Sequence, residues 1–106
     1  MLRLSIIIKE NTMYPIHPGE HLKEILDELG LSQNAFAILI GVSAMRISHV
    51  VKGKRPVTAE LAVLFGKAFG QTPQFWMNLQ AGYDLKLAEI LLAQRIKQVR
   101  PLAVAA

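Results

Sequence analysis

The sequence predicts an all-α protein with one domain. Its 106 residues are 52% hydrophobic but only 7% aromatic, and this composition, rich in Leu and Ala, suits a helical bundle better than a sheet. Apolar residues recur three and four positions apart in successive segments, which begin at Ser, Thr or Pro and end at Gly, as helices do. A chain of this length buries one modest core. We therefore expect one domain at 13–100, between an extension at 1–12 and a tail at 101–106.

The first two helices are expected within residues 17–30 and 31–41. Pro18 suits the first turn of the earlier helix, and Ser32 is a suitable N-terminal cap for the later one. Each segment ends at a Gly, which adopts the positive φ of a helix end without strain. The residues expected to face inward are Leu22, Ile25, Leu26 and Leu29 in the first helix, and Phe36, Ala37 and Ile40 in the second.

Two further helices are expected within residues 42–53 and 55–70, with Ser43 and Thr58 as their caps. Both segments again end at a Gly. The residues expected to be buried are Ile47, Val50 and Val51 in the third helix, and Leu61, Ala62, Phe65 and Phe69 in the fourth. The third helix then exposes Ala44, Met45, Arg46, Ser48, His49 and Lys52.

The sequence from 71 to 99 predicts an extended C-terminal helix, capped by Thr72 with Pro73 at its first position. Gly82 interrupts this segment, which forms either one long helix or two shorter ones. The first twelve residues alternate apolar and polar side chains, as a short edge strand does. This extension either pairs with another chain or lies outside the working protein, with Met13 as an alternative start.

Several classes of function are excluded by what the sequence lacks. Without Cys there is no disulfide, thiolate zinc site or cysteine nucleophile, which favours a reducing cytoplasm. No apolar run approaches the roughly 20 residues of a transmembrane helix, so we expect a soluble protein with no membrane contact. The basic 53–55 segment lacks the other residues of a phosphate-binding loop, and we expect no enzymatic activity. His17 and His21 have no third ligand beside them, so a capping or surface role is favoured over a metal, and no cofactor is expected.

A basic segment without acidic residues extends from Gly41 to Pro56. The whole chain carries a net charge of +4, and such a balance raises the expectation of a polyanionic partner. Two short helices joined by a tight turn, within residues 31–54, predict a helix-turn-helix motif. The second helix of that motif can enter the major groove of DNA.

The stretch LSQNAFAILIGVSAMRISHVVKGKRPVT, residues 31–58, resembles the helix-turn-helix of the Cro and phage-repressor (XRE) family. The stretch GKRPVTAELAVLFGKAFGQTPQFWMNLQAGYDL, residues 53–85, resembles the HigA-type antitoxin branch of that family, also called virulence-associated protein I. The resemblance covers Pro15 to Ala88. It implies a five-helix lambda-repressor-like domain that binds double-stranded operator DNA as a homodimer, represses its own operon and neutralises a small basic mRNA-cleaving toxin. The alternatives are an orphan transcription regulator without a toxin partner and a purely protein-binding adaptor.

The resemblance also implies which residues face DNA. Gln33 is expected to contact a phosphate, while Ala44, Met45 and His49 face the base edges. Because Ala44 and Met45 offer apolar contact alone, for example to a thymine methyl group, polar readout of bases falls to Arg46 and His49. Arg46 is equally able to rest on a phosphate. The further residues predicted at the DNA surface are Ser43, Ser48, Lys52, Lys54 and Arg55, the last three as backbone contacts.

Two more surfaces are predicted to bind protein. The resemblance implies a dimer seam along the last helix, formed by Phe75, Trp76, Leu79 and Tyr83, although Trp76 equally suits the core. Ile38 and Leu39 occupy positions that the family pattern turns outward, so they either form an interface or belong to a rotated helix that buries Leu39. The acidic residues on one face of the first helix are either simply solvated or attract a basic toxin. These residues are Glu20, Glu24 and Asp27.

Overall fold

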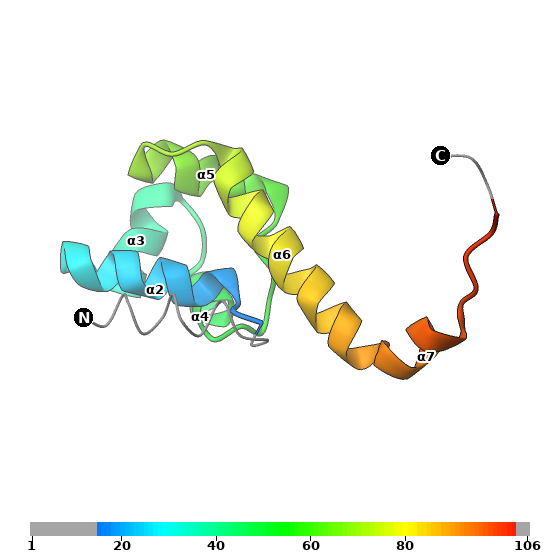
Figure 1. Cartoon of the computed structure of the whole chain (residues 1–106). Coiled ribbons are helices and arrows are strands. Elements are labelled where there is room, and N and C mark those ends of the chain that lie inside the picture. Colours follow the sequence, from blue (N-terminus) through cyan, green and yellow to red (C-terminus); the bar gives the residue numbers. More distant parts are fainter. Residues whose placement is uncertain (1–14, 104–106) are drawn as a thin grey trace.

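A computed structural model describes residues 15–103, and this part of the chain contains six α-helices and no strand. Their bounds are α2 (Pro18–Leu29), α3 (Gln33–Ile40), α4 (Ala44–Val51), α5 (Ala59–Phe69), α6 (Pro73–Leu91) and α7 (Ala93–Gln98). The all-α prediction is confirmed. The strand predicted at 1–12 lies outside the described residues. Helices α2 to α5 and the first half of α6 form the body, whereas the rest of α6 and α7 project away from it (Figure 1).

Side-chain caps begin the first five of these helices. The four predicted caps are confirmed, because the hydroxyl oxygens of Ser32, Ser43, Thr58 and Thr72 each accept a hydrogen bond from a backbone N–H three residues later. α2 begins differently, since Nδ1 of His17 accepts from the N–H of Gly19 at 2.9 Å. The capping role considered for His17 is therefore confirmed. Among residues 15–103, no cluster of three His, Cys, Asp or Glu side chains could hold a metal ion.

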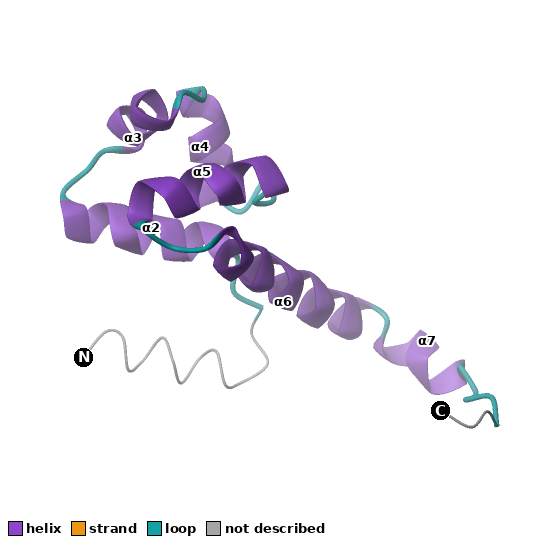
Figure 2. Cartoon of the chain, turned by 90° about the horizontal axis from the view of Figure 1, so that it is seen from above, coloured by secondary structure: helices purple, strands orange, loops and turns teal. Residues whose placement is uncertain are grey.

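The core lies between α2, α3, α4 and α5 and is closed by the first half of α6 (Figure 2). Its three largest fully buried side chains are Trp76, Phe36 and Phe65, and the rings of Phe65 and Trp76 meet edge to face with centroids 5.1 Å apart. The other core residues are Leu22, Leu26, Ala37, Ile47, Val50, Val57, Leu61 and Ala62. One expectation is wrong: Leu29 is exposed, because it lies in the last turn of α2, next to the end of the helix.

The C-terminal segment forms two helices and not one, so the described chain has six helices where five were expected. The break falls at Leu92, and α6 continues through Gly82, which is tolerated inside a helix at a cost of about 1 kcal/mol relative to Ala. We call residues 85–103 the C-terminal arm. None of the helices between residues 15 and 103 combines the length and the apolar character needed to cross a membrane.

Gly19 allows α2 to approach the end of α4 closely. A Cβ atom added at Gly19 would lie 1.9 Å from the carbonyl oxygen of Val50, a distance that real atoms do not reach. Because the obstacle is backbone, it cannot be relieved by a change of rotamer. The absence of a side chain at Gly19 therefore allows α4 to pack closely against α2.

Candidate nucleic-acid interface

Helices α3 and α4 are joined by the predicted tight turn. Gly41 has a φ of 77°, and the N–H groups of Gly41 and Val42 both donate to the carbonyl of Ala37, at 2.9 and 3.0 Å. Ser43 then begins α4 by accepting from the N–H of Arg46 at 3.1 Å. α4 packs against both α3 and α2 and buries Ile47 and Val50. The helix-turn-helix geometry predicted from the sequence is present.

The outer side of α4 carries the residues that sequence reasoning placed at DNA. Ala44 and Met45 are exposed in its first turn, Lys52 is exposed at its end, and His49 is half-buried between them. Ser48 and Gln33, the first residue of α3, are half-buried too. With apolar groups at the start of this helix and a cation at its end, the surface suits contact with base methyl groups and phosphates.

The loop that follows α4 continues the cationic surface. We call residues 53–55 the basic loop. Its backbone turns back onto the helix, because the N–H groups of Lys54 and Arg55 both donate to the carbonyl of His49, at 2.8 and 3.2 Å. The side chains of Lys54 and Arg55 are exposed. Lys52, Lys54 and Arg55 therefore form a short exposed cationic strip at one end of α4, and cationic side chains of this kind bind phosphates.

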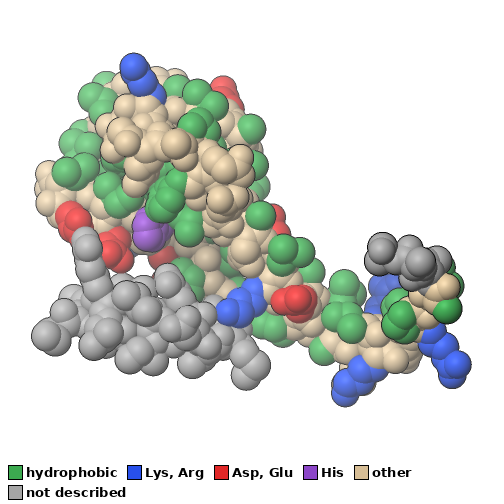
Figure 3. Space-filling view, turned by 45° about the horizontal axis from the view of Figure 1, so that its top comes forward, with side chains coloured by type: hydrophobic (Ala, Val, Ile, Leu, Met, Phe, Trp, Pro, Cys, Tyr) green, Lys and Arg blue, Asp and Glu red, His purple; other side chains and the backbone are tan. Residues whose placement is uncertain are grey.

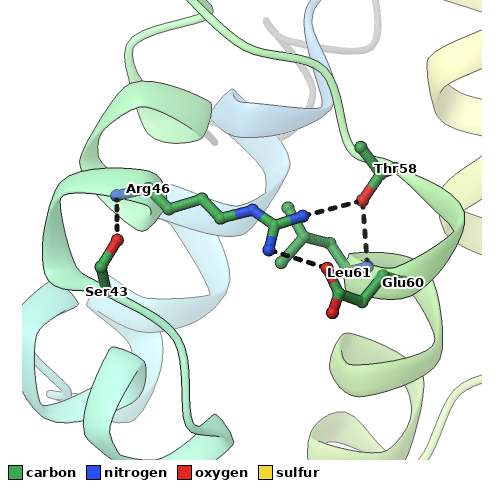
Figure 4. Close-up of polar contacts among 5 residues, drawn as sticks. All are labelled: Ser43, Arg46, Thr58, Glu60 and Leu61. Carbon is green, nitrogen blue, oxygen red and sulfur yellow. Dashed lines mark hydrogen bonds and ion pairs between the residues drawn. The ribbon is translucent and has the colours of Figure 1, made fainter.

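Arg46 does not point freely to solvent (Figure 4). Its Nη1 lies 2.8 Å from Oε1 of Glu60, and its Nη2 donates to Oγ1 of Thr58 at 3.2 Å. The Arg46 side chain is 28% exposed and that of Glu60 is 66% exposed. Because Thr58 also caps α5, Arg46 joins α4 to the start of α5. Nothing in the sequence pattern distinguishes Glu60 from an ordinary acidic residue in a first helical turn, so this pairing was missed.

The surfaces predicted to bind protein are accessible in part. Trp76 is fully buried and its Nε1–H donates to Oε1 of Gln71 at 2.8 Å, so Trp76 belongs to the core and the prediction that it lies in a dimer seam is wrong. A large aromatic residue in the first turn of α6 faces the body, because that turn is the part of α6 that covers the core. Phe75, Leu79 and Tyr83 are half-buried. Their part in a dimer seam stays a prediction.

Ile38 and Leu39 are 74% and 68% exposed. The alternative in which a rotated α3 buries Leu39 is therefore wrong. On the acidic face of α2, Glu20 and Asp27 are exposed and Glu24 is half-buried. Asp27 pairs with Lys23 through an Oδ2–Nζ contact of 2.8 Å. This ion pair reduces the negative charge that the face presents.

A family model described as helix-turn-helix matches residues 22–76, just over half of the chain. The protein belongs to the helix-turn-helix family. The expectation of a DNA-binding, non-enzymatic protein agrees with this family. The matched residues extend from α2 to the first turn of α6 and so include α3, α4 and the basic loop.

Relatives at the level of whole chains confirm the resemblance to HigA-type antitoxins. The helix-turn-helix protein is 44% identical to virulence-associated protein I of Dichelobacter nodosus over 87 residues, which cover 81% of each chain. It matches the structure of Pseudomonas aeruginosa PA4674 in complex with its operator DNA, with a TM-score of 0.82, 38% identity, and coverage of 87% of this chain and 99% of that chain. It also matches Pseudomonas aeruginosa antitoxin HigA with the higBA promoter, with a TM-score of 0.81, 36% identity, and coverage of 86% and 100%.

Proposed function

We propose that the protein is an antitoxin that binds its own operator as a homodimer, represses its operon and neutralises a small mRNA-cleaving toxin. One observation carries the proposal: the chain shares its fold, over nearly the full length of the other protein, with a relative bound to operator DNA. The exposed outer side of α4 and the cationic strip beside it supply the chemistry that such binding needs.

In the proposed complex, α4 enters the major groove of DNA. Ala44 and Met45 contact thymine methyl groups or fill space, and His49 supplies a polar base contact. Gln33, Lys52, Lys54 and Arg55 contact phosphates, so they contribute affinity and salt dependence more than sequence choice. Ser43 and Ser48 lie at the same surface. Arg46 reads a guanine or rests on a phosphate once DNA replaces Glu60 as its partner.

The proposed dimer uses α6 and the C-terminal arm. A single recognition helix makes an interface too small for specific binding, and dimers of this motif read half-sites about 34 Å apart. The arm projects from the body and carries exposed apolar side chains among basic ones (Figure 3). The exposed apolar residues are Leu85, Ile90, Leu91, Leu92, Ile96, Val99 and Leu102. A seam that begins at Phe75, Leu79 and Tyr83 and continues along the arm covers these apolar groups.

The proposed toxin contact uses the exposed pair Ile38 and Leu39, with the acidic face of α2 as a secondary element. Two adjacent large apolar side chains this exposed favour a protein partner over water. A toxin that cleaves mRNA presents a positive surface to its substrate, and Glu20, Glu24 and Asp27 attract such a surface. Attraction of this kind raises the association rate more than the final affinity, and it weakens with salt.

The test of DNA binding uses the fragment upstream of the gene and a scrambled duplex of the same length, with fluorescence anisotropy at about 0.15 M salt. We expect the upstream fragment to bind at least about a thousandfold more tightly. Met45→Asp is the control, because it places an acid on the outer side of α4 without touching the core. Equal affinity for the two duplexes contradicts the proposal. If DNA binding holds but the product of the neighbouring gene does not co-purify, the orphan regulator is the better description.

A further inference from the structure

The basic loop is held from behind by the ring of His17. A Cβ atom added at Gly53 would lie 3.6 Å from Cγ of His17, so the imidazole lies directly beside the loop at this residue. Since Nδ1 of the ring accepts from the N–H of Gly19, this nitrogen carries no proton and the ring is neutral.

A second anchor comes from α6. Oε1 of Gln80 accepts from the N–H of Val57 at 2.7 Å, just beyond the basic loop. Nε2 of the same amide donates to Oδ1 of Asp84 at 2.9 Å, and Asp84 lies close enough to His17 to interact with its charge. The ring of His17 also meets that of Tyr83 edge to face, with centroids 4.9 Å apart. The start of α2, the basic loop and α6 are therefore joined by one connected set of contacts, in which His17 and Gln80 are buried.

We propose that His17 and Gln80 are positioning residues that hold the basic loop where Lys54 and Arg55 reach DNA phosphates. The inference rests on the proposed DNA contact by this loop, and it adds the two side chains on which that contact depends. Neither residue faces the DNA surface itself: both are buried behind it. They act through the loop backbone, so they affect affinity for all DNA sequences equally.

The anchor at His17 is sensitive to acid. Protonated imidazole has no acceptor, so it loses the hydrogen bond from Gly19. Burial lowers the pKa of His17 from the usual 6.5, opposed by Asp84, the Arg55 backbone and Glu20. The stability that the neutral ring contributes is therefore present above pH 6.5 and is lost as pH falls through the lowered pKa. The titratable and charged groups around this ring are Glu20 and His21 on α2, Tyr83, Asp84 and Lys86 on α6, and Arg55 in the loop.

The test compares His17→Asn with wild type. Asn is a good N-cap, so α2 keeps its first hydrogen bond, but its smaller side chain does not fill the space beside Gly53 that the imidazole occupies. We expect binding of operator and random duplexes to weaken by the same factor, roughly threefold to tenfold. The slope of log affinity against log salt is expected to fall by about 0.9 for each phosphate that the loop no longer reaches. His21→Asn is the matched control, because it removes a neighbouring histidine on the same helix whose ring meets those of Phe75 and Trp76, and we expect it to bind as wild type.

The pH dependence separates positioning from general stability. Between about pH 8 and 5.5 the affinity of wild type relative to His17→Asn is expected to fall, because the two proteins differ only at this residue. Unchanged affinity and salt slope in His17→Asn, or a loss confined to the operator, overturns the inference.

Nuclear magnetic resonance of the wild-type protein alone gives an independent result. As pH is lowered, the amide chemical shifts of Gly53, Lys54 and Arg55 should change with the same midpoint as the imidazole signals of His17. Amide shifts that follow a different group contradict the inference. This result does not depend on whether His17→Asn folds. If wild type binds no DNA, the proposed function fails, whereas the amide titration still decides whether His17 holds the loop.

Discussion

At the scale of single residues, the guanidinium of Arg46 has a partner inside the chain, which changes how a substitution there is interpreted. Arg46→Ala removes both a candidate base contact and the link to Glu60 and Thr58. We expect it to cost roughly 1–3 kcal/mol on the operator and little on random DNA, whereas Lys54→Ala weakens both equally. Measuring both affinities for both variants gives the comparison. The same ratio of specific to random affinity in the two variants contradicts the division of roles.

Glu60→Gln separates the two roles of Arg46. It removes the ion pair and a negative charge near the DNA surface but leaves Arg46 available. An exposed pair of this kind contributes at most about 1 kcal/mol, so the fold should be retained. We expect Glu60→Gln to bind the operator as well as wild type or better. If it instead loses as much affinity as Arg46→Ala, Arg46 acts through Glu60 and not on DNA.

Gly19 and Gly82 provide a matched pair of glycines on two helices. Gly19→Ala places a Cβ against the Val50 carbonyl, so either α2 or α4 must move, and we expect a loss of roughly 1–3 kcal/mol in the free energy of unfolding. Gly82→Ala meets open space inside α6 and should gain roughly 0.5–1 kcal/mol. Thermal unfolding of the two variants measures both changes. Equal melting temperatures would show that α2 and α4 adjust at no cost.

At the scale of elements, the apolar part of the proposed toxin surface lies on the outer side of α3. Ile38→Ser combined with Leu39→Ser changes two exposed residues, so we expect stability and DNA affinity within about 0.5 kcal/mol of wild type. Binding of the neighbouring toxin should be lost, as measured by co-purification and by growth rescue when both genes are expressed. If the double variant still rescues growth, α3 is not part of the toxin interface.

The element boundaries also show which features can be predicted from the sequence. Ser32, Ser43, Thr58 and Thr72 cap helices whose starts they themselves signal, because a cap acts on a backbone group three residues away. The break at Leu92 has no such signal, since neither Gly nor Pro stands near it. The hydrogen bond from Val57 to Gln80 joins residues 23 apart. Its partners become neighbours only through packing, so the sequence pattern did not reveal the anchors of the basic loop.

At the scale of the whole molecule, the proposed dimerisation through the C-terminal arm determines whether two recognition helices act together. Leu85→Lys combined with Leu91→Lys adds charge at two exposed positions without disturbing the core. We expect this variant to sediment as a monomer at micromolar concentration where wild type is a dimer. Its operator affinity should fall toward that of a single half-site. A variant that stays dimeric would place the seam elsewhere.

The continuity of α6 has a mechanical consequence. This helix runs unbroken for 19 residues, about 28 Å, from Trp76 and Gln80 in the core to the projecting arm. In the proposed dimer, a seam that includes the outer half of α6 makes this helix a rigid connection between the two α4 helices. No flexible joint along α6 then absorbs a change in the position of one half-site relative to the other. Inserting one base pair between the half-sites rotates one of them by about a tenth of a turn, and we expect this change to weaken binding. Inserting a whole helical turn restores the orientation of the half-sites but separates them by more than the rigid dimer spans. In the proposed dimer, we therefore expect the stiffness of α6 to set the spacing of the operator half-sites.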